Sequence, residues 1–390
     1  MEKKNRFPTK HPMKNNGEFF SLSPITSRRR KIARNQYNLI VFCHLRWEFV
    51  YQRPQHILSR LARNYRILIV EEPILFGPGE ENSFIKRKVT RNIDVFQPKV
   101  KSVSDIPALL KMYLSKTSYS IGWFYSAAFV PVLKSFEFET IVYDCMDELS
   151  LFKGASSKII EQEKQLMKKA HVVFTGGMSL FESKNKNHHN THCFRSSVDE
   201  AHFGTACNIL QFPEDIAHIS NPIVGYFGVI DERIDLELLR ETALRVPNVA
   251  FVMIGPVVKI QESDLPRMDN IHYLGQKSYE ELPSYLAAFD IAMMPFALND
   301  STKYISPTKT LEYMAAKKPI ISTKIKDVVR DYGTCVNLID NVDDFCNAIN
   351  NSKIDYYEML GQYEEILSNT SWDATVEKMK SIINKKFYYE

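Results

Sequence analysis

The run Ile223-Val224-Gly225-Tyr226-Phe227-Gly228 is a short apolar segment that ends in glycine, which is typical of a strand buried on both faces of a parallel sheet. A helical pattern spans 235–245, and the apolar run 249–256 then repeats the strand pattern. Strands that alternate with helices predict a doubly wound α/β sheet. The alternation continues in the runs 271–275 and 291–296, separated by a helical pattern at 278–289.

The N-terminal half shows the same alternation. Leu39-Ile40-Val41-Phe42 is the first apolar run, and 52–64 has apolar residues at helical spacing. Later strands are expected at 66–70, 120–125, 140–144 and 171–175, with a helix at 157–169. Two such domains, each Rossmann-like, should face a cleft at the carboxyl ends of their strands, where open sheets bind ligands.

Length and charge narrow the class of protein. A chain of 390 residues with 44% apolar residues is long enough for two domains. Residues 1–36 hold ten Lys or Arg against two acids, a charge of +8, so the remainder carries −4 of the net +4. An acidic body with a basic arm argues against nucleic acid and fits an enzyme. The arm either contacts anionic lipid headgroups or is a solvated, disordered tail.

Localisation and metal content follow from what the sequence lacks. No apolar run approaches the length of a membrane span and no secretion signal begins the chain, so we expect a cytoplasmic protein, with peripheral contact to the inner face of the membrane as an option. Six scattered cysteines form no CxxC pair, so reduced thiols are expected. The cluster 188–192, rich in His and Asn, is interpreted as an exposed polar loop, and neither a metal site nor a cofactor is predicted.

The stretch 305–316 predicts an anion site. Ser306 suits an N-cap and Pro307 suits the first helical position, so the amides of Thr308 and Lys309 should point outward, with the Lys309 charge beside them. Glu312 lies one turn later, and its carboxylate can accept hydrogen bonds from two ribose hydroxyls. The pairing suits a nucleotide sugar, although an ordinary capped amphipathic helix is the alternative.

The motifs of the C-terminal half, taken in order, resemble the nucleotide-sugar domain of retaining GT-B glycosyltransferases of family four. They are the runs 228–233, 254–256, 271–275, 282–283, 290–295 and 312–319. The N-terminal runs 42–56, 143–149 and 193–199 resemble a bacterial branch with teichuronic-acid and related envelope-polysaccharide transferases. The likeness covers residues 38–380, so the basic arm lies outside it.

The resemblance implies a donor pocket in the C-terminal domain. Glu312 would hold the ribose, with Thr308 and Lys309 at the diphosphate. Arg233 would approach the same phosphates from the Gly228 turn; a surface Arg paired with Glu232 or Asp235 is the alternative.

Two positions depart from the family pattern. The first of two acids that usually lie seven residues apart is replaced by Tyr304, and the nearest upstream acid is Asp300; either could reach donor-sugar hydroxyls. Val229 and Ile234 occupy places where bases are common, so the phosphate charge should fall on Arg233 and Lys309, with help from Lys303.

Candidates on the acceptor side come from the ends of N-terminal strands. Asp144 and Asp147 should lie on the rim facing the cleft, although Asp147 could instead cap a helix. The other acceptor-side candidates are His44, Arg46 and Arg53. With Arg233 and Lys309, Asp147 completes the set of catalytic candidates.

We therefore expect a metal-independent transferase that moves a sugar, with retention, from a nucleotide diphosphate to a saccharide or lipid-linked saccharide of the cell envelope. The alternatives are a nucleotide-sugar epimerase of the same fold and a noncatalytic partner protein. The expected boundaries are an arm at 1–37, an acceptor-side domain at 38–205, a linker at 206–222, a nucleotide-sugar domain at 223–370 and a crossover helix at 371–390.

Overall fold

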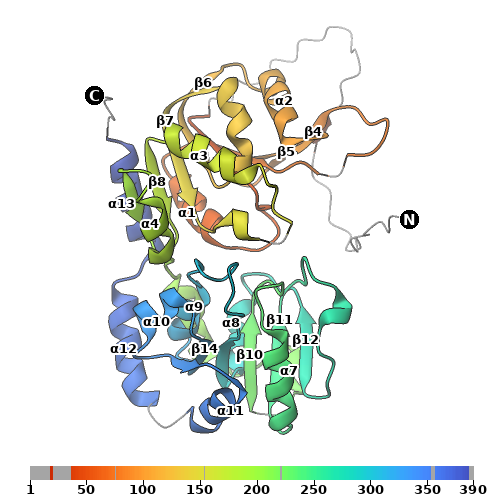
Figure 1. Ribbon diagram of the computed structural model, residues 1–390, viewed down its shortest axis with the longest axis vertical. Helices are drawn as coiled ribbons and strands as arrows, with labels where there is room; N and C mark the ends of the chain where they lie inside the picture. The colour runs from red at the N-terminus through yellow and green to blue at the C-terminus, as the bar shows by residue number, and fades with distance from the viewer. Residues whose placement is uncertain are drawn as a thin grey trace.

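The computed structural model has two α/β domains stacked one above the other (Figure 1). It describes residues 18–20, 37–74, 76–152, 154–219, 222–352 and 356–385. This architecture confirms the predicted fold class, two parallel-sheet domains with a C-terminal helix that returns to the first domain.

The N-terminal domain is built on a nine-stranded sheet of order β1-β4-β5-β3-β2-β6-β7-β8-β9. All neighbours from β5 to β9 pair in parallel, whereas β4 runs antiparallel to both β5 and β1. The strands are β1 Glu18–Phe20, β2 Leu39–Cys43, β3 Ile67–Glu71, β4 Ser83–Lys88, β5 Ile93–Lys99, β6 Ser118–Phe124, β7 Glu137–Cys145, β8 Val172–Thr175 and β9 Thr191–Cys193. Every residue of β2 and β3 is buried, because helices cover both faces of the sheet.

Two apolar cores flank that sheet. The helices of the domain are α1 Arg53–Leu61, α2 Ile106–Tyr113, α3 Ile159–Lys169 and α4 Met178–Lys184; the next helix, α5 Glu200–Phe203, already packs into the C-terminal core through Phe203. The shorter 3-10 helices are η1 Val103–Asp105, η2 Ala127–Lys134 and η3 Leu149–Leu151, whereas η4 Gly204–Asn208 places Ala206 in the C-terminal core. The alternation of helix and strand brings the loops after β2, β7 and β8 to the edge that faces the other domain.

The C-terminal domain has a six-stranded parallel sheet of order β12-β11-β10-β13-β14-β15 around a single apolar core. Its strands are β10 Ile223–Phe227, β11 Ala250–Ile254, β12 Ile271–Gly275, β13 Ile291–Met294, β14 Ile320–Thr323 and β15 Asn337–Ile339. Its helices are α6 Glu214–Ala217, α7 Leu236–Arg245, η5 Glu262–Asp264, α8 Leu282–Ala288, α9 Lys309–Ala315, α10 Lys326–Tyr332, α11 Val342–Asn351 and α12 Tyr356–Ser368. The strand order reverses at β10, so the loops after β10, β11 and β13 open toward the N-terminal domain.

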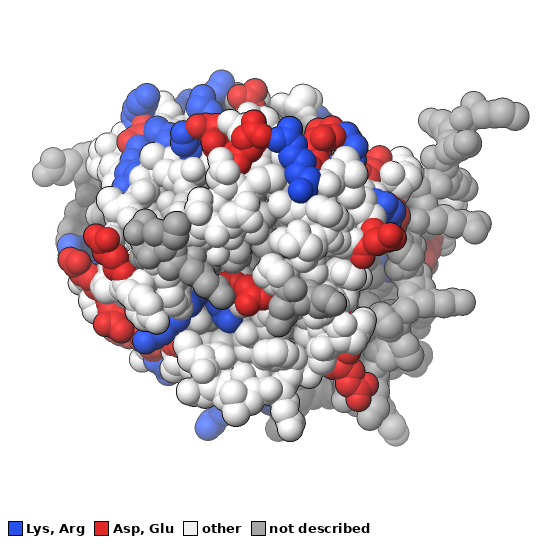
Figure 2. Space-filling model, turned by 90° about the horizontal axis from the view of Figure 1, so that it is seen from below, with Lys and Arg blue, Asp and Glu red and all other residues white. Residues whose placement is uncertain are grey.

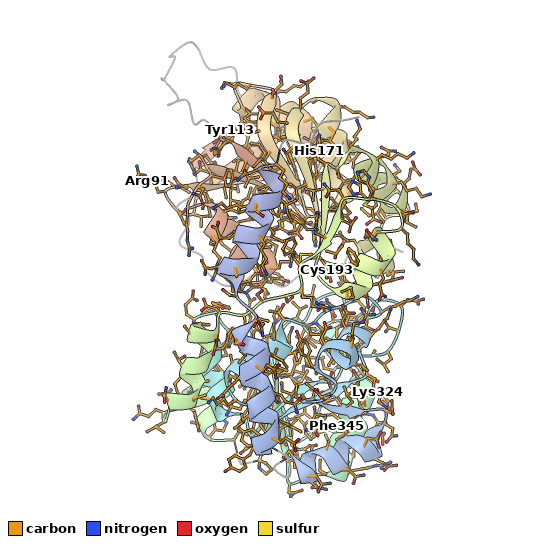
Figure 3. The ribbon with its side chains drawn as sticks, turned by 90° about the vertical axis from the view of Figure 1, so that its left-hand side faces the viewer. Arg91, Tyr113, His171, Cys193, Lys324 and Phe345 are labelled. Carbon is orange, nitrogen blue, oxygen red and sulfur yellow. The ribbon has the colours of Figure 1, made fainter. Side chains whose placement is uncertain are left out.

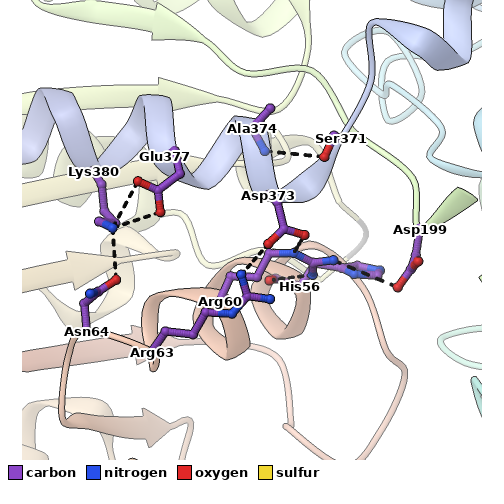
Figure 4. Close-up of polar contacts among 10 residues, drawn as sticks. All are labelled: His56, Arg60, Arg63, Asn64, Asp199, Ser371, Asp373, Ala374, Glu377 and Lys380. Carbon is purple, nitrogen blue, oxygen red and sulfur yellow. Dashed lines mark hydrogen bonds and ion pairs between the residues drawn. The ribbon is translucent and has the colours of Figure 1, made fainter. Parts of the chain in front are cut away.

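Helix α13, Trp372–Ile383, carries the chain back to the N-terminal domain; Figure 3 shows it in line with α12 along one side of the molecule. Trp372, Val376 and Met379 join the core beneath the N-terminal sheet. Polar contacts fix the exposed edge of α13 to α1: Asp373 accepts a hydrogen bond of 3.0 Å from Arg60, and Lys380 donates one of 2.9 Å to Asn64 (Figure 4). The predicted crossover therefore joins the two domains through a buried interface.

Three expected loops contain regular structure. Within the arm, Glu18–Phe20 form β1 at the sheet edge, so the prediction of disorder is wrong there; the other arm residues before Tyr37, and with them the proposed lipid contact, lie outside the described residues. The expected linker contains α6, with Ile216 buried in the C-terminal core. His188 is buried and β9 follows it, so the interpretation of 188–192 as an exposed loop is also wrong.

Two further features are the charge distribution on the surface of the C-terminal domain and the apolar character of the helices. Figure 2 views the end of the C-terminal domain from below, where positive and negative side chains are interspersed around a largely uncharged centre. Among the described helices, none combines the length and the apolar character that crossing a membrane requires.

Candidate nucleotide-sugar site

A cavity open to solvent lies between the domains, at the carboxyl ends of both sheets, with about 1220 Å³ of empty space when the adjoining open solvent is included. It is the place that the reversal of strand order predicts for a ligand in open sheets of this kind. Nine of the residues predicted from the sequence line it: Arg53, Asp147, Gly228, Arg233, Ser306, Pro307, Thr308, Lys309 and Glu312.

Helix α9 supplies Lys309 and Glu312 to one wall of the cavity. Its N-cap is Thr308, and Ser306 makes no capping hydrogen bond, so the prediction of Ser306 as N-cap is wrong by two residues. Lys309 and Glu312 lie one turn apart. Since α9 is only seven residues long, the Lys309 side chain supplies more positive charge here than the helix backbone.

Gly228 makes room for the Lys309 side chain. Its φ of +140° lies in the region that side chains rarely adopt, and an added Cβ would lie 2.2 Å from Lys309 Cε. The Lys309 ammonium lies 5.5 Å from the centre of the Tyr226 ring. The glycine turn after β10 therefore positions a cation at the cavity floor.

Arg233 is held by an acid from its own loop. Its Nε and Nη2 bind both carboxylate oxygens of Asp231 at 2.8–3.1 Å, and its backbone amide donates to Asp231 at 3.0 Å. The partner is thus neither Glu232 nor Asp235, the two that the alternative interpretation named. Phe152 of the N-terminal domain covers the guanidinium, with Cζ 5.4 Å from its ring centre. This clamp leaves Arg233 half-buried in the cavity wall.

Burial shifts the pKa values of the charged groups in the cavity. It raises the pKa of Glu312 to about 7, against the opposing effect of Lys309. It lowers the pKa of Lys309, and the neighbouring Arg233 adds to that effect while Glu312 opposes it. It raises the pKa of Asp147, although Arg233 and Lys259 favour the ionised form. The cavity therefore holds a carboxyl group that titrates near neutrality.

Most of the predicted acceptor-side residues have structural partners. Asp144 is fully buried and its Oδ1 accepts hydrogen bonds of 3.1 and 2.9 Å from Arg53, so the prediction that Asp144 faces the cleft is wrong. Arg46 donates to the carbonyls of Glu72 and Pro73 and does not line the cavity. Burial lowers the pKa of His44 to about 4, with Lys259 adding to the effect. The buried ion pair of Arg53 and Asp144 joins residues that are distant in sequence, so a local sequence pattern cannot reveal it.

The two residues considered as replacements for the first acid lie outside the cavity lining. Tyr304 packs against the N-terminal core, and Lys303 lies over its ring at 5.5 Å from the centre. Asp300 is exposed in a turn. Asp147, by contrast, lines the cavity, and the cap of η3 is Glu148, so the helix-cap alternative for Asp147 is not observed.

Sequence reasoning missed an aromatic pair at the domain boundary. Tyr51 and Tyr279 line the cavity from opposite domains, and their rings stack at 4.4 Å between centres. It also missed Lys259, whose ammonium lies 4.3 Å from the centre of the Phe152 ring and whose φ is +64°. None of these belongs to a local motif, because their partners come from the other domain.

Comparisons with known proteins agree with this geometry. Residues 221–352, about a third of the chain, match the family model described as "Glycosyl transferases group 1". The chain is 24% identical over 217 residues to the Bacillus subtilis (strain 168) protein named "Putative teichuronic acid biosynthesis glycosyltransferase TuaH". That match covers 50% of this chain and 53% of the relative, and so spans about half of its length.

Solved structures share the two-domain fold. Sucrose-phosphate synthase from Thermosynechococcus elongatus superposes with a TM-score of 0.65 at 15% identity, covering 88% of this chain and 97% of that one. Anabaena Alr3699/HepE in complex with UDP and glucose gives a TM-score of 0.63 at 14% identity, covering 90% and 100%. At these identities the likeness concerns the fold, and it supports the GT-B architecture.

Proposed function

We propose that this chain is a retaining glycosyltransferase that moves a sugar from a nucleotide-diphosphate sugar to a hydroxyl of a saccharide or lipid-linked saccharide in cell-envelope synthesis. One observation carries the proposal: Glu312, Lys309 and Arg233 line one interdomain cavity, a carboxyl group beside two cations. That set matches a nucleoside diphosphate, whose ribose hydroxyls donate and whose phosphates accept. The match to the glycosyl transferase model and the teichuronic-acid relative support the substrate class.

The chemistry follows from where charge grows. As the bond from the sugar to the diphosphate breaks, negative charge builds on the leaving phosphate, and Arg233 and Lys309 would stabilise it in a partly desolvated site. Asp231 occupies Nε and Nη2 of Arg233, so its Nη1 edge is the one that would serve the phosphate. The leaving phosphate would accept the proton of the attacking hydroxyl on the same face of the sugar, which retains the configuration.

Asp147 lines the cavity from the N-terminal domain, near enough to Arg233 and Lys309 for both to favour its ionised form. In this proposal its carboxylate accepts a hydrogen bond from a hydroxyl of the donor sugar or of the acceptor. The proposal includes no metal ion, because side-chain cations take the phosphate charge. Activity should therefore survive treatment with EDTA followed by metal-free buffer, and a rate restored only by Mg²⁺ or Mn²⁺ would contradict that part.

Two measurements test the function. Thermal melting with UDP, GDP and ADP and their sugars should show stabilisation by one nucleotide family. Release of that nucleotide should then depend on a saccharide acceptor, and the anomeric configuration of the first product, read by NMR, should equal that of the donor. Interconversion of nucleotide sugars without nucleotide release would identify an epimerase instead, and unchanged melting with every nucleotide would favour a noncatalytic protein.

The matched variant for the site is Glu312→Gln, which keeps the size of the side chain but loses the carboxylate. It should weaken stabilisation by nucleotide while the melting temperature without ligand stays close to that of the wild type. Full transfer activity in this variant would contradict the assignment of the ribose site.

A further inference from the structure

The two domains touch beside the cavity through α4 and α10, which Figure 1 shows at the facing edges of the N-terminal and C-terminal domains. Asp327 of α10 is 1% exposed, and its carboxylate accepts hydrogen bonds from the backbone amide of Ser179 at 3.2 and 3.3 Å and from the Ser179 hydroxyl. Ser179 is the second residue of α4, whose N-cap, Gly177, has no side chain with which to accept those donors. Asp327 thus caps a helix of the other domain.

Gly177 marks a point where the domains come very close. A Cβ added to it would lie 2.4 Å from Asp327 Oδ2 and 2.8 Å from Ser306 Cβ. The φ of Gly177, −160°, is extended backbone that any residue adopts, so the requirement for glycine is space between the domains. The neighbouring Gly176 and Ser306 both line the cavity, so this contact forms part of its wall.

Further polar contacts surround the Asp327 cap. Glu182 of α4 binds Lys326 and Arg330 of α10, each at 2.7 Å. Nearby, the Thr308 hydroxyl donates to the Ser196 hydroxyl at 3.0 Å across the same boundary. The ion pairs of Glu182 are half-exposed, so each contributes little to the free energy that holds the two domains together. Asp327 is buried and accepts hydrogen bonds from donors that would otherwise lack partners.

We propose that Asp327 is a positioning residue that sets the width of the cleft: it holds the Gly176–Gly177 turn against the Ser306–Thr308 segment and so keeps water away from the donor sugar. This inference rests on the proposed function. Without the contact, a water oxygen would form the new bond to the anomeric carbon while the bond to the diphosphate breaks. The water proton would leave with the diphosphate, and the products would be free sugar and nucleotide.

Two variants should increase the distance between the domains at the contact of Gly177 with Asp327, one by adding atoms and the other by removing a hydrogen-bond acceptor. Gly177→Ala adds a methyl group between Asp327 and Ser306, and Asp327→Asn replaces an acceptor oxygen with a donor amide while keeping the size of the side chain. Gly361→Ala is the matched control, because a Cβ at Gly361 meets nothing within 4 Å. Each protein would be assayed for the ratio of donor hydrolysis to transfer, and for the distance between dyes placed on the two domains, with and without the nucleotide that stabilises the wild type.

Both variants should raise the hydrolysis-to-transfer ratio by on the order of tenfold to a hundredfold and lengthen the interdomain distance, whereas Gly361→Ala should change neither. A wild-type ratio and distance in folded Gly177→Ala and Asp327→Asn would overturn the inference. Should Gly177→Ala fail to fold, Asp327→Asn and the milder Ser179→Ala carry the same test. If the wild type neither binds nucleotide nor transfers sugar, the proposed function fails, while the dye distances still decide whether Asp327 holds the domains together.

Discussion

Donor binding should weaken as the pH falls through neutrality, because burial raises the pKa of Glu312 to about 7. Ribose hydroxyls donate hydrogen bonds, so the competent form of Glu312 is the ionised carboxylate. The apparent dissociation constant varies inversely with the ionised fraction, which falls from about nine-tenths at pH 8 to about one-tenth at pH 6. Affinity should therefore fall about tenfold between these two conditions, or about 1.4 kcal/mol.

The direction of this pH effect on donor affinity follows from the direction of the Glu312 pKa shift. A raised pKa means that the empty site favours the protonated acid, so a ligand that needs the ionised form must release a proton when it binds near pH 6. Titration calorimetry in buffers of different ionisation enthalpy measures both the affinity and that proton. The Glu312→Gln variant is the control, since it retains whatever pH dependence the phosphates of the ligand contribute. Equal pH dependence in the two proteins, or tighter wild-type binding at pH 6, would refute the reasoning.

Three further results are expected. Arg233→Ala should lower kcat by about 10²- to 10³-fold, measured as acceptor-dependent nucleotide release, because it removes a cation from the growing charge; a change in KM alone would contradict this role. Gly228→Ala should weaken nucleotide binding in calorimetry, because its φ of +140° strains any side chain and the new Cβ would displace the Lys309 side chain, whereas Gly361→Ala should bind normally. Trp372→Ala should destabilise the N-terminal domain by about 3–5 kcal/mol in urea unfolding, because Trp372 is 1% exposed; a wild-type midpoint would show that α13 adds little.

The parts of the fold that the sequence predicts well are those in which local pattern and burial agree. β2 and β10 are continuous apolar runs because both faces of each sheet are covered, and their positions are confirmed to within a residue or two. β4 was missed because Ser83–Lys88 carries three basic residues and lies half-exposed near the sheet edge. β15, Asn337–Ile339, is three residues long, too short for any periodicity to identify.

The difference between local patterns and distant contacts also explains which residues of the site could be predicted from the sequence. Lys309 and Glu312 lie on one helix turn, so their spacing could be read from the sequence and both line the cavity. Asp144 and Arg53 are 91 residues apart, and only the fold shows that they neutralise each other. A local reading treats every charged residue at a strand end as available to ligand, and it cannot tell which of them already has a buried partner.

The charge balance of the cavity bears on how it could favour the transition state over the bound donor. Each cation near the predicted phosphate position has an acid close by: Arg233 binds Asp231 at 2.8 Å, and Lys309 lies one helix turn from Glu312. Asp231 holds Arg233 in place, and the two acids partly neutralise the cations, which should keep the affinity for the ground-state diphosphate moderate. As charge grows on the leaving phosphate, the cations gain interaction energy without moving, and stabilisation that appears only then accelerates the chemical step. A stronger field from unpaired cations would bind the released nucleotide as tightly as the transition state and slow turnover.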